Sequence, residues 1–208
     1  MISTPVRTYI ENALSSFDII PAQRKEKLTA IAGYIADKLK RCERAELIYI
    51  CTHNSRRSHF GQIWGSVSAA YYRLPNIYTY SGGTETTAFN SNAIKALERI
   101  GFIVNMLNSG PNPRYRLGFG ENEPEIICFS KVYDNNTNPQ IGFCAIMTCS
   151  DAEENCPFIP GAEKRVATPY EDPKKADNSP EQDNIYDERC LQIARETLYV
   201  FSLVKDLV

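Results

Sequence analysis

Apolar residues recur every three or four positions through the first 41 residues, the spacing that places side chains on one face of a helix. Pro21 interrupts this pattern, because proline lacks the amide hydrogen that a helix interior needs. Lysine and arginine occupy the opposite face of the second half. We therefore expect two helices here, forming an N-terminal helical extension over residues 1–45.

From residue 46 the pattern changes to short apolar runs that alternate with amphipathic segments. ELIYIC (46–51) is a continuous apolar run, as expected for a parallel strand buried on both faces. A helical pattern extends from Phe60 to Tyr71, and a second strand (76–83) and a second helix (90–102) follow. Strands and helices in alternation predict βαβ units and a parallel sheet.

The alternation stops between residues 105 and 140, where two β-rich segments flank a turn rich in glycine, asparagine and proline, which predicts an inserted β-hairpin. A buried strand (142–149) and a short last strand (164–168) follow, and SPEQ (179–182) predicts a capping box before a long C-terminal helix. The predicted fold class is α/β: a doubly wound, four-stranded parallel sheet in a catalytic domain that spans 46–208.

Composition limits the classes of function. The chain has 208 residues, 43% of them hydrophobic, which is enough for a sizeable core, and its net charge of −2 does not favour nucleic acid as a partner. It contains no apolar run of 18 residues, so no membrane span is expected. The first residues lack the layout of a signal peptide, which predicts a cytoplasmic location.

The cysteines do not suggest a disulfide framework or a metal site. There are seven, an odd number in a chain without an export signal. No C-x-x-C pair occurs and the only histidines are His53 and His59, so we expect no metal. Cys128 and Cys144 lie inside strand-like runs and are predicted to be buried core residues.

Cys51 differs from these, because it ends the first predicted strand and Arg57 follows six positions later. A loop between a parallel strand and the next helix lies at the carboxyl edge of the sheet, where ligands bind. The helix N-terminus suits a tetrahedral oxyanion, and the arginine fork can hold two of its oxygens. The same field favours the thiolate form of Cys51. Ser58 can donate a hydrogen bond to the sulfur, and Asn54 can brace the loop.

The sequence therefore predicts a loop that binds an oxyanion and directs a nucleophile at its central atom. The candidate oxyanion-binding residues are Thr52, His53, Asn54, Ser55, Arg56, Arg57 and Ser58.

This pattern of Cys51, five intervening residues, Arg57 and Ser58 after an apolar strand resembles the anion loop of the low-molecular-weight protein tyrosine phosphatase superfamily, which includes thioredoxin-coupled arsenate reductases. YSGGTETTAFNSNAIKALERIGF (80–102) is similar to the second strand and helix of that superfamily. PYEDP (169–173) resembles its Asp-Pro segment, which implies Asp172 as the general acid that protonates the leaving oxygen.

TCSDAEENCPFIPG (148–161) resembles the resolving-cysteine segment of the arsenate reductases. The resemblance implies that Cys51 attacks arsenate, Cys149 attacks Cys51, and Cys156 attacks Cys149. The resulting Cys149–Cys156 disulfide would be reduced by an external thioredoxin-like thiol, without a cofactor.

Two alternatives remain open at this point. One is a phosphatase of the same superfamily, which hydrolyses a phosphate ester through a phosphocysteine at Cys51. The other is a non-catalytic oxyanion-binding or redox-sensing module. His53 stands where the superfamily commonly has glycine, and a positive φ there would strain a residue with a Cβ. Arg56 stands where the reductases often carry a cysteine, which is expected to favour a bulkier anion.

Overall fold

The computed structural model describes residues 1–150, 152 and 158–208. Its elements, in chain order, are α1 (Thr4–Leu14), the 3-10 helix η1 (Phe17–Ile19), α2 (Ala22–Lys40), β1 (Ala45–Cys51), α3 (Arg57–Tyr72), β2 (Ile77–Gly83), α4 (Ser91–Ile100), β3 (Ile103–Met106), β4 (Tyr115–Gly118), β5 (Ile126–Cys128), β6 (Phe143–Met147), β7 (Ala162–Ala167), the 3-10 helix η2 (Pro173–Ala176) and α6 (Gln182–Leu207). Among the described residues, no helix is both long and apolar enough to cross a bilayer.

The central element is a four-stranded parallel sheet with the order β2-β1-β6-β7 within the described residues. β1 pairs with β2 along its whole length, so that Cys51 lies opposite Gly83. On its other side β1 pairs with β6, and Ile50 lies opposite Met147. The carboxyl ends of these three strands therefore meet at one edge of the sheet, and the predicted α/β fold with a four-stranded parallel sheet is confirmed.

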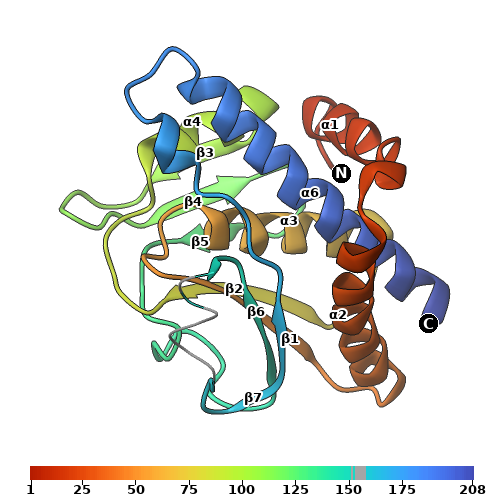
Figure 1. Cartoon of the computed structure of the whole chain (residues 1–208). Helices are drawn as coiled ribbons and strands as arrows, with labels where there is room; N and C mark the ends of the chain where they lie inside the picture. The colour runs from red at the N-terminus through yellow and green to blue at the C-terminus, as the bar shows by residue number, and fades with distance from the viewer. Residues whose placement is uncertain (151, 153–157) are drawn as a thin grey trace.

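Side chains of β1 alternate between two cores, as the pleat of a strand requires. Leu47 and Tyr49 pack with residues of α2 and α6, whereas Ile48 and Ile50 pack on the other face together with Cys149. α6 contacts α1, α2, α3 and α4, and Figure 1 shows it (blue) crossing these helices as a long diagonal. This helix therefore packs against both N-terminal helices, of which α2 also contacts β1 and β7 directly.

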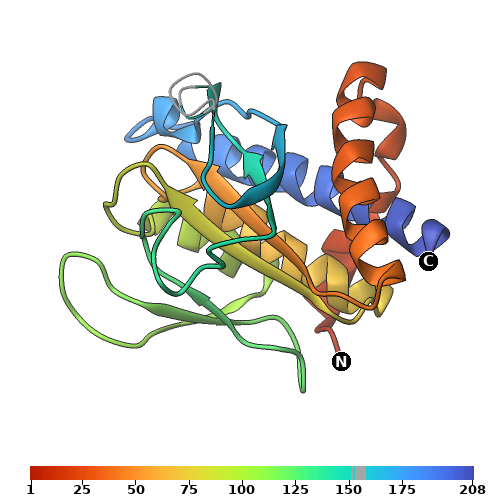
Figure 2. The same cartoon turned by 90° about the horizontal axis from the view of Figure 1, so that it is seen from below.

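The predicted inserted β-hairpin is present as the antiparallel pair β4 and β5, but it belongs to a larger sheet. It carries two strands of a three-stranded antiparallel sheet with the order β3-β4-β5, in which Ile103 lies opposite Gly118. The unpredicted strand is β3, which follows α4 directly and is largely exposed, with Ile103 at 67%. It therefore lacks the buried alternation that would identify a strand. Figure 2 shows this sheet (green) on the opposite side of the molecule from α2 (red-orange).

The predicted capping box is also wrong. α6 begins at Gln182, and the Ser179 hydroxyl donates to the Ala176 carbonyl at 2.8 Å instead of capping the helix. Gln182 accepts a hydrogen bond from the Asn178 amide at 2.9 Å. The short helix η2 ends at Ala176, so Ser179 serves the turn after that helix rather than the start of the next one.

A close approach of α3 to β1 predicts a stability effect at Gly61. A Cβ at this position would overlap the Tyr49 ring. We expect Gly61→Ala to lower the free energy of unfolding by about 1–3 kcal/mol, because neither the helix nor the buried ring can move without disturbing the core. Urea denaturation followed by circular dichroism measures this change.

The matched control is Gly33→Ala in α2, where a Cβ would meet no atom within 4 Å. This variant should gain up to about 1 kcal/mol, because alanine favours a helix interior. Equal stability of the Gly61→Ala variant and the unaltered protein would show that α3 does not lie as close to β1 as described.

Candidate active site

The nucleophile candidate lies where β1 meets the loop before α3. Cys51 is the last residue of β1 and is 3% exposed. Its Sγ lies 3.1 Å from the Ser58 Oγ, and Asn54 Nδ2 donates to that same oxygen at 2.8 Å. Because the Ser58 oxygen accepts from Asn54, its own hydrogen is free to point at the sulfur. The predicted roles of Ser58 and Asn54 therefore agree with this geometry.

The carbonyl groups of the loop point outward. In a trans peptide unit the C=O and the following N–H point in opposite directions. The N–H groups that follow these carbonyls are therefore expected to face the interior of the loop, which is the arrangement that binds an oxyanion. Four of these carbonyls accept hydrogen bonds from residues outside the loop: Cys51 from the Thr84 amide, Thr52 from the Glu85 amide, His53 from the Ser130 hydroxyl, and Ser55 from the Asn90 amide.

The left-handed position of the loop is Asn54, with φ 44°, and not His53. The strain expected from a histidine in place of glycine is therefore absent, and asparagine tolerates this conformation better than most residues. The His53 ring is partly exposed, and its Nε2 lies 3.6 Å from Glu85 Oε2. This observation removes the reason for expecting an impaired loop.

Arg57 begins α3 and is buried against the segment that precedes η2. Its Nη1 donates to the Tyr170 carbonyl at 2.9 Å, and its Nη2 lies 2.6 Å from Asp172 Oδ2. The buried Nε has no hydrogen-bond partner among the described residues. One edge of the guanidinium is thus held in place, while the Nε remains available to a bound anion.

Asp172, the predicted general acid, lies beside Arg57. Its Oδ2 contacts Arg57 and its Oδ1 accepts from the Lys174 amide at 3.0 Å, the cap of η2. The carboxyl group is therefore held at the N-terminus of a short helix and beside the arginine. The structure brings Asp172, from the segment before η2, to the loop that carries Cys51 and Arg57.

Arg56, one of the predicted oxyanion-binding residues, is paired with side chains outside the loop. Its Nε donates to the Tyr186 hydroxyl at 2.7 Å, and its Nη2 lies 3.2 Å from Asp177 Oδ2. Burial raises the pKa of Tyr186 to about 12, so its hydroxyl stays protonated and donates to Asp177 at 2.7 Å. No sequence motif indicated this cluster, which ties the loop to α6.

Cys149 lies beside the nucleophile loop. It follows the end of β6 by two residues, is fully buried, and its Sγ is 3.5 Å from the Thr52 Oγ1. The Ala152 amide also donates to this sulfur at 3.4 Å. Cys51 and Cys149 belong to the same buried cluster. The other predicted relay residue, Cys156, lies outside the described residues.

The remaining buried thiols are poor candidates for redox chemistry. Burial raises the pKa of Cys128, Cys144 and Cys190 to about 12 in each case, so these groups stay protonated at neutral pH. The prediction that Cys128 and Cys144 are buried core residues is confirmed. Within the part of the chain that the structure describes, no cluster of histidine, cysteine, aspartate and glutamate could hold a metal ion.

Comparison with known proteins gives sequence relatives for most of the chain. No family model matches. An arsenate reductase of Bacillus subtilis is 26% identical over 136 residues, covering 65% of this chain and 79% of the relative. Arsenate reductase 2 of Staphylococcus epidermidis is 27% identical over 131 residues, covering 63% and 80%.

Solved structures give the fold. A low-molecular-weight phosphotyrosine phosphatase of Vibrio cholerae superposes with a TM-score of 0.51 at 13% identity, covering 76% of this chain and 95% of that one. The low-molecular-weight protein tyrosine phosphatase of T. tengcongensis has a TM-score of 0.50 at 12% identity, covering 76% and 98%. At these identities the likeness concerns the arrangement of helices and strands alone.

Proposed function

We propose that this chain, which has the low-molecular-weight protein tyrosine phosphatase fold and is similar in sequence to the arsenate reductases of that superfamily, reduces arsenate to arsenite. The observation that supports this reaction best is the position of Cys149, whose sulfur lies at the nucleophile loop, 3.5 Å from Thr52 Oγ1. Hydrolysis of a phosphate ester needs no second thiol at this place.

In the first step arsenate occupies the loop, held by inward N–H groups and by the Nε of Arg57. The Cys51 thiolate attacks arsenic, an S–As bond forms, and one arsenate oxygen leaves as hydroxide or water. Asp172 lies close enough to Arg57 to serve the same site and supplies the proton for that oxygen. No oxidation state changes in this step.

The second step transfers the electrons. The Cys149 thiolate attacks the Cys51 sulfur, the S–As bond breaks, and its electron pair stays on arsenic, which leaves as arsenite. Cys51 and Cys149 are then joined in a disulfide. The Cys156 thiolate attacks the Cys149 sulfur, which releases the Cys51 thiolate and leaves a Cys149–Cys156 disulfide.

An external dithiol must reduce that disulfide before the next turnover, and we propose a thioredoxin-like protein in this role. The cycle needs no cofactor besides this thiol. The cytoplasmic location expected from the sequence belongs to the same proposal, because a cytosol that keeps thiols reduced maintains Cys51, Cys149 and Cys156 in their reactive form.

The test is to mix the fully reduced protein with arsenate under limiting reductant and to locate disulfides by mass spectrometry of peptides. We expect a Cys149–Cys156 disulfide and one arsenite per protein chain. Cys149→Ser should form no such disulfide and release no arsenite, because the thiol that accepts the Cys51 adduct is absent. The same variant should retain any hydrolysis of p-nitrophenyl phosphate.

The matched control is Cys42→Ser, since Cys42 is the exposed free cysteine described outside the loop. It should reduce arsenate like the unaltered protein. Free thiols after arsenate treatment, combined with steady p-nitrophenyl phosphate hydrolysis, would contradict the proposal and favour the phosphatase. Phosphate or arsenate binding without either reaction would favour the oxyanion-binding module.

A further inference from the structure

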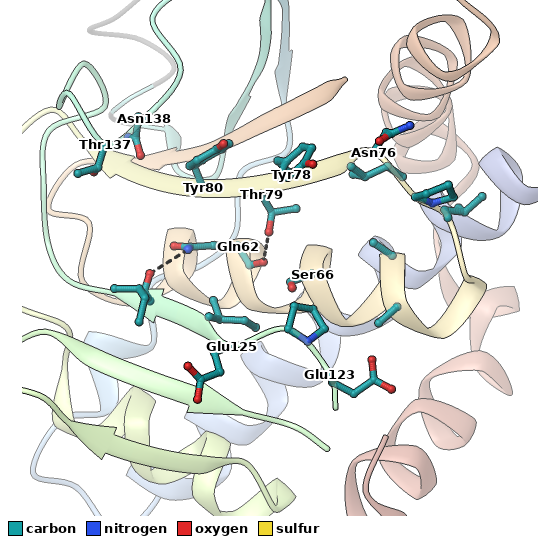
Figure 3. Close-up of a pocket in the computed structure, with 18 of the residues that line it drawn as sticks. Gln62, Ser66, Asn76, Tyr78, Thr79, Tyr80, Glu123, Glu125, Thr137 and Asn138 are labelled. Atoms are coloured by element: carbon teal, nitrogen blue, oxygen red, sulfur yellow. Dashed lines mark hydrogen bonds between the residues drawn. The ribbon is translucent and has the colours of Figure 1, made fainter. Parts of the chain in front are cut away.

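A cleft of about 780 Å³ lies between β2, α3 and the antiparallel sheet. Figure 3 shows Tyr78, Thr79 and Tyr80 of β2 on one side, with Gln62 and Ser66 of α3 behind them. Within the described residues, β2 and β5 are edge strands of their sheets, so the cleft lies where the two sheets face each other. Its volume is in the range of small-molecule sites.

One end of this cleft carries two cations on a single aromatic ring. Lys131 Nζ lies 4.6 Å, and Arg114 Cζ 4.5 Å, from the centre of the Phe129 ring. All three residues line the cleft. Among the described residues, neither cation has a carboxylate within 4.0 Å. Lys131 is only 5% exposed, so water compensates little of its charge.

The acidic residues of the cleft do not balance these charges, because both have other partners. Glu123 Oε1 lies 3.3 Å from the N-terminal ammonium of Met1. Glu125 Oε1 lies 3.5 Å from Arg116 Nη1. Within the described part of the chain, the end of the cleft that holds Lys131 and Arg114 is therefore positive and has no negative group paired with either cation.

The buried position of Lys131 disfavours its protonated form. Burial lowers its pKa to about 8, and the charge of Arg114 contributes in the same direction, while Cys128 opposes it. His59 of α3 also lies near Lys131, and burial, together with the charge of that lysine, keeps the pKa of His59 well below its usual range. His59 is therefore neutral and adds no charge to this end of the cleft, whereas at pH 7 Lys131 is still mostly protonated.

We propose that this cleft binds a small organic anion, whose acidic group lies between Lys131 and Arg114 and whose apolar body extends between β2 and α3. The lining also supplies apolar surface, because it contains Leu74, Ile77 and Ile126. An inorganic anion would leave this apolar surface exposed to water, which favours an organic ligand.

The cleft is separate from the nucleophile loop but is joined to it. The Lys131 amide donates to Asn54 Oδ1 at 2.9 Å, and the Lys131 carbonyl accepts from the Gly83 amide at 2.8 Å. Asn54 in turn holds Ser58 beside Cys51. A ligand that shifts Lys131 therefore acts on the segment that braces the loop.

The probe is naphthalene-2-carboxylate, titrated into the full chain by isothermal titration calorimetry in a saturating concentration of phosphate. Phosphate occupies the nucleophile loop, so naphthalene-2-carboxylate that still binds must occupy another site. The measurement does not depend on turnover. We expect binding of the carboxylate and at least about tenfold weaker binding of the neutral naphthalene-2-carboxamide, because a charge-assisted hydrogen bond is lost.

Arg114→Gln and Lys131→Met should each weaken binding of the carboxylate at least about tenfold. Arg114 is exposed, so its replacement leaves folding intact. The matched control is Lys95→Gln, an exposed lysine of α4 outside the cleft, which should bind like the unaltered protein. Equal affinity for the carboxylate and the carboxamide, equal effects of Arg114→Gln and Lys95→Gln, or competition by phosphate would each overturn the proposal.

Discussion

Cys51→Ser is expected to abolish both arsenate reduction and any phosphate-ester hydrolysis, with rates lowered at least about 10⁴-fold. The substitution should leave the fold intact, because serine has nearly the size of cysteine and the backbone at this position is paired in the sheet. The hydroxyl is far less nucleophilic than a thiolate at neutral pH. Initial rates of arsenite release and p-nitrophenol release measure the effect.

Binding provides the control for this variant. Cys51→Ser should still bind phosphate, since the outward carbonyls, Arg57 and Ser58 are unchanged. Calorimetry with phosphate tests whether the loop is intact. Residual turnover above about 1% of the original rate would mean that another group performs the attack.

Arg57→Lys is expected to lower kcat/KM for arsenate by about 10²- to 10³-fold. The guanidinium bonds Tyr170 and Asp172 through its two terminal nitrogens while its Nε has no partner within the described residues. A lysine offers one nitrogen, which cannot hold Asp172, the Tyr170 carbonyl and an oxyanion together. Lysine keeps the positive charge, so the loss of kcat/KM measures what the planar guanidinium contributes beyond its charge.

The matched control is Arg99→Lys, which alters an exposed arginine that pairs with Asp183 and Asp187 on the surface. It should leave kcat/KM unchanged, because such exposed pairs contribute little and lie far along the chain from the loop. Arg57→Lys with the kinetic constants of the unaltered protein would exclude a role for the Arg57 fork in holding the anion.

The places of Cys51 and Arg57 in the fold could be predicted because both rest on a local pattern, whereas Asp172 came from the resemblance of PYEDP (169–173) to the Asp-Pro segment of the superfamily. An apolar run marked β1, and its abrupt end marked the loop. Parallel strands then place such loops at one edge whatever the details of packing. The fold class followed from the same alternation of strands and helices.

Features that depend on distant contacts could not be predicted. The pairing of Arg56 with Asp177 and Tyr186 joins residues more than 100 positions apart. The left-handed residue of the loop is Asn54 because its side chain is bonded on both sides, which no neighbouring residue in the sequence indicates. β3 escaped notice because its pairing with β4, and not its own hydrophobic pattern, makes it a strand.

The bonds between the inserted segment and the loop limit how this protein can be shortened. Ser130 donates to the His53 carbonyl, and the Lys131 amide donates to Asn54. A version trimmed to the minimal phosphatase fold by removing residues 105–140 would lose both donors. The His53 carbonyl would keep only the Thr87 hydroxyl, and the buried Asn54 Oδ1 would lose the Lys131 amide. The insertion is therefore not a detachable module, and engineering or evolutionary loss of it requires new residues that replace these donors first.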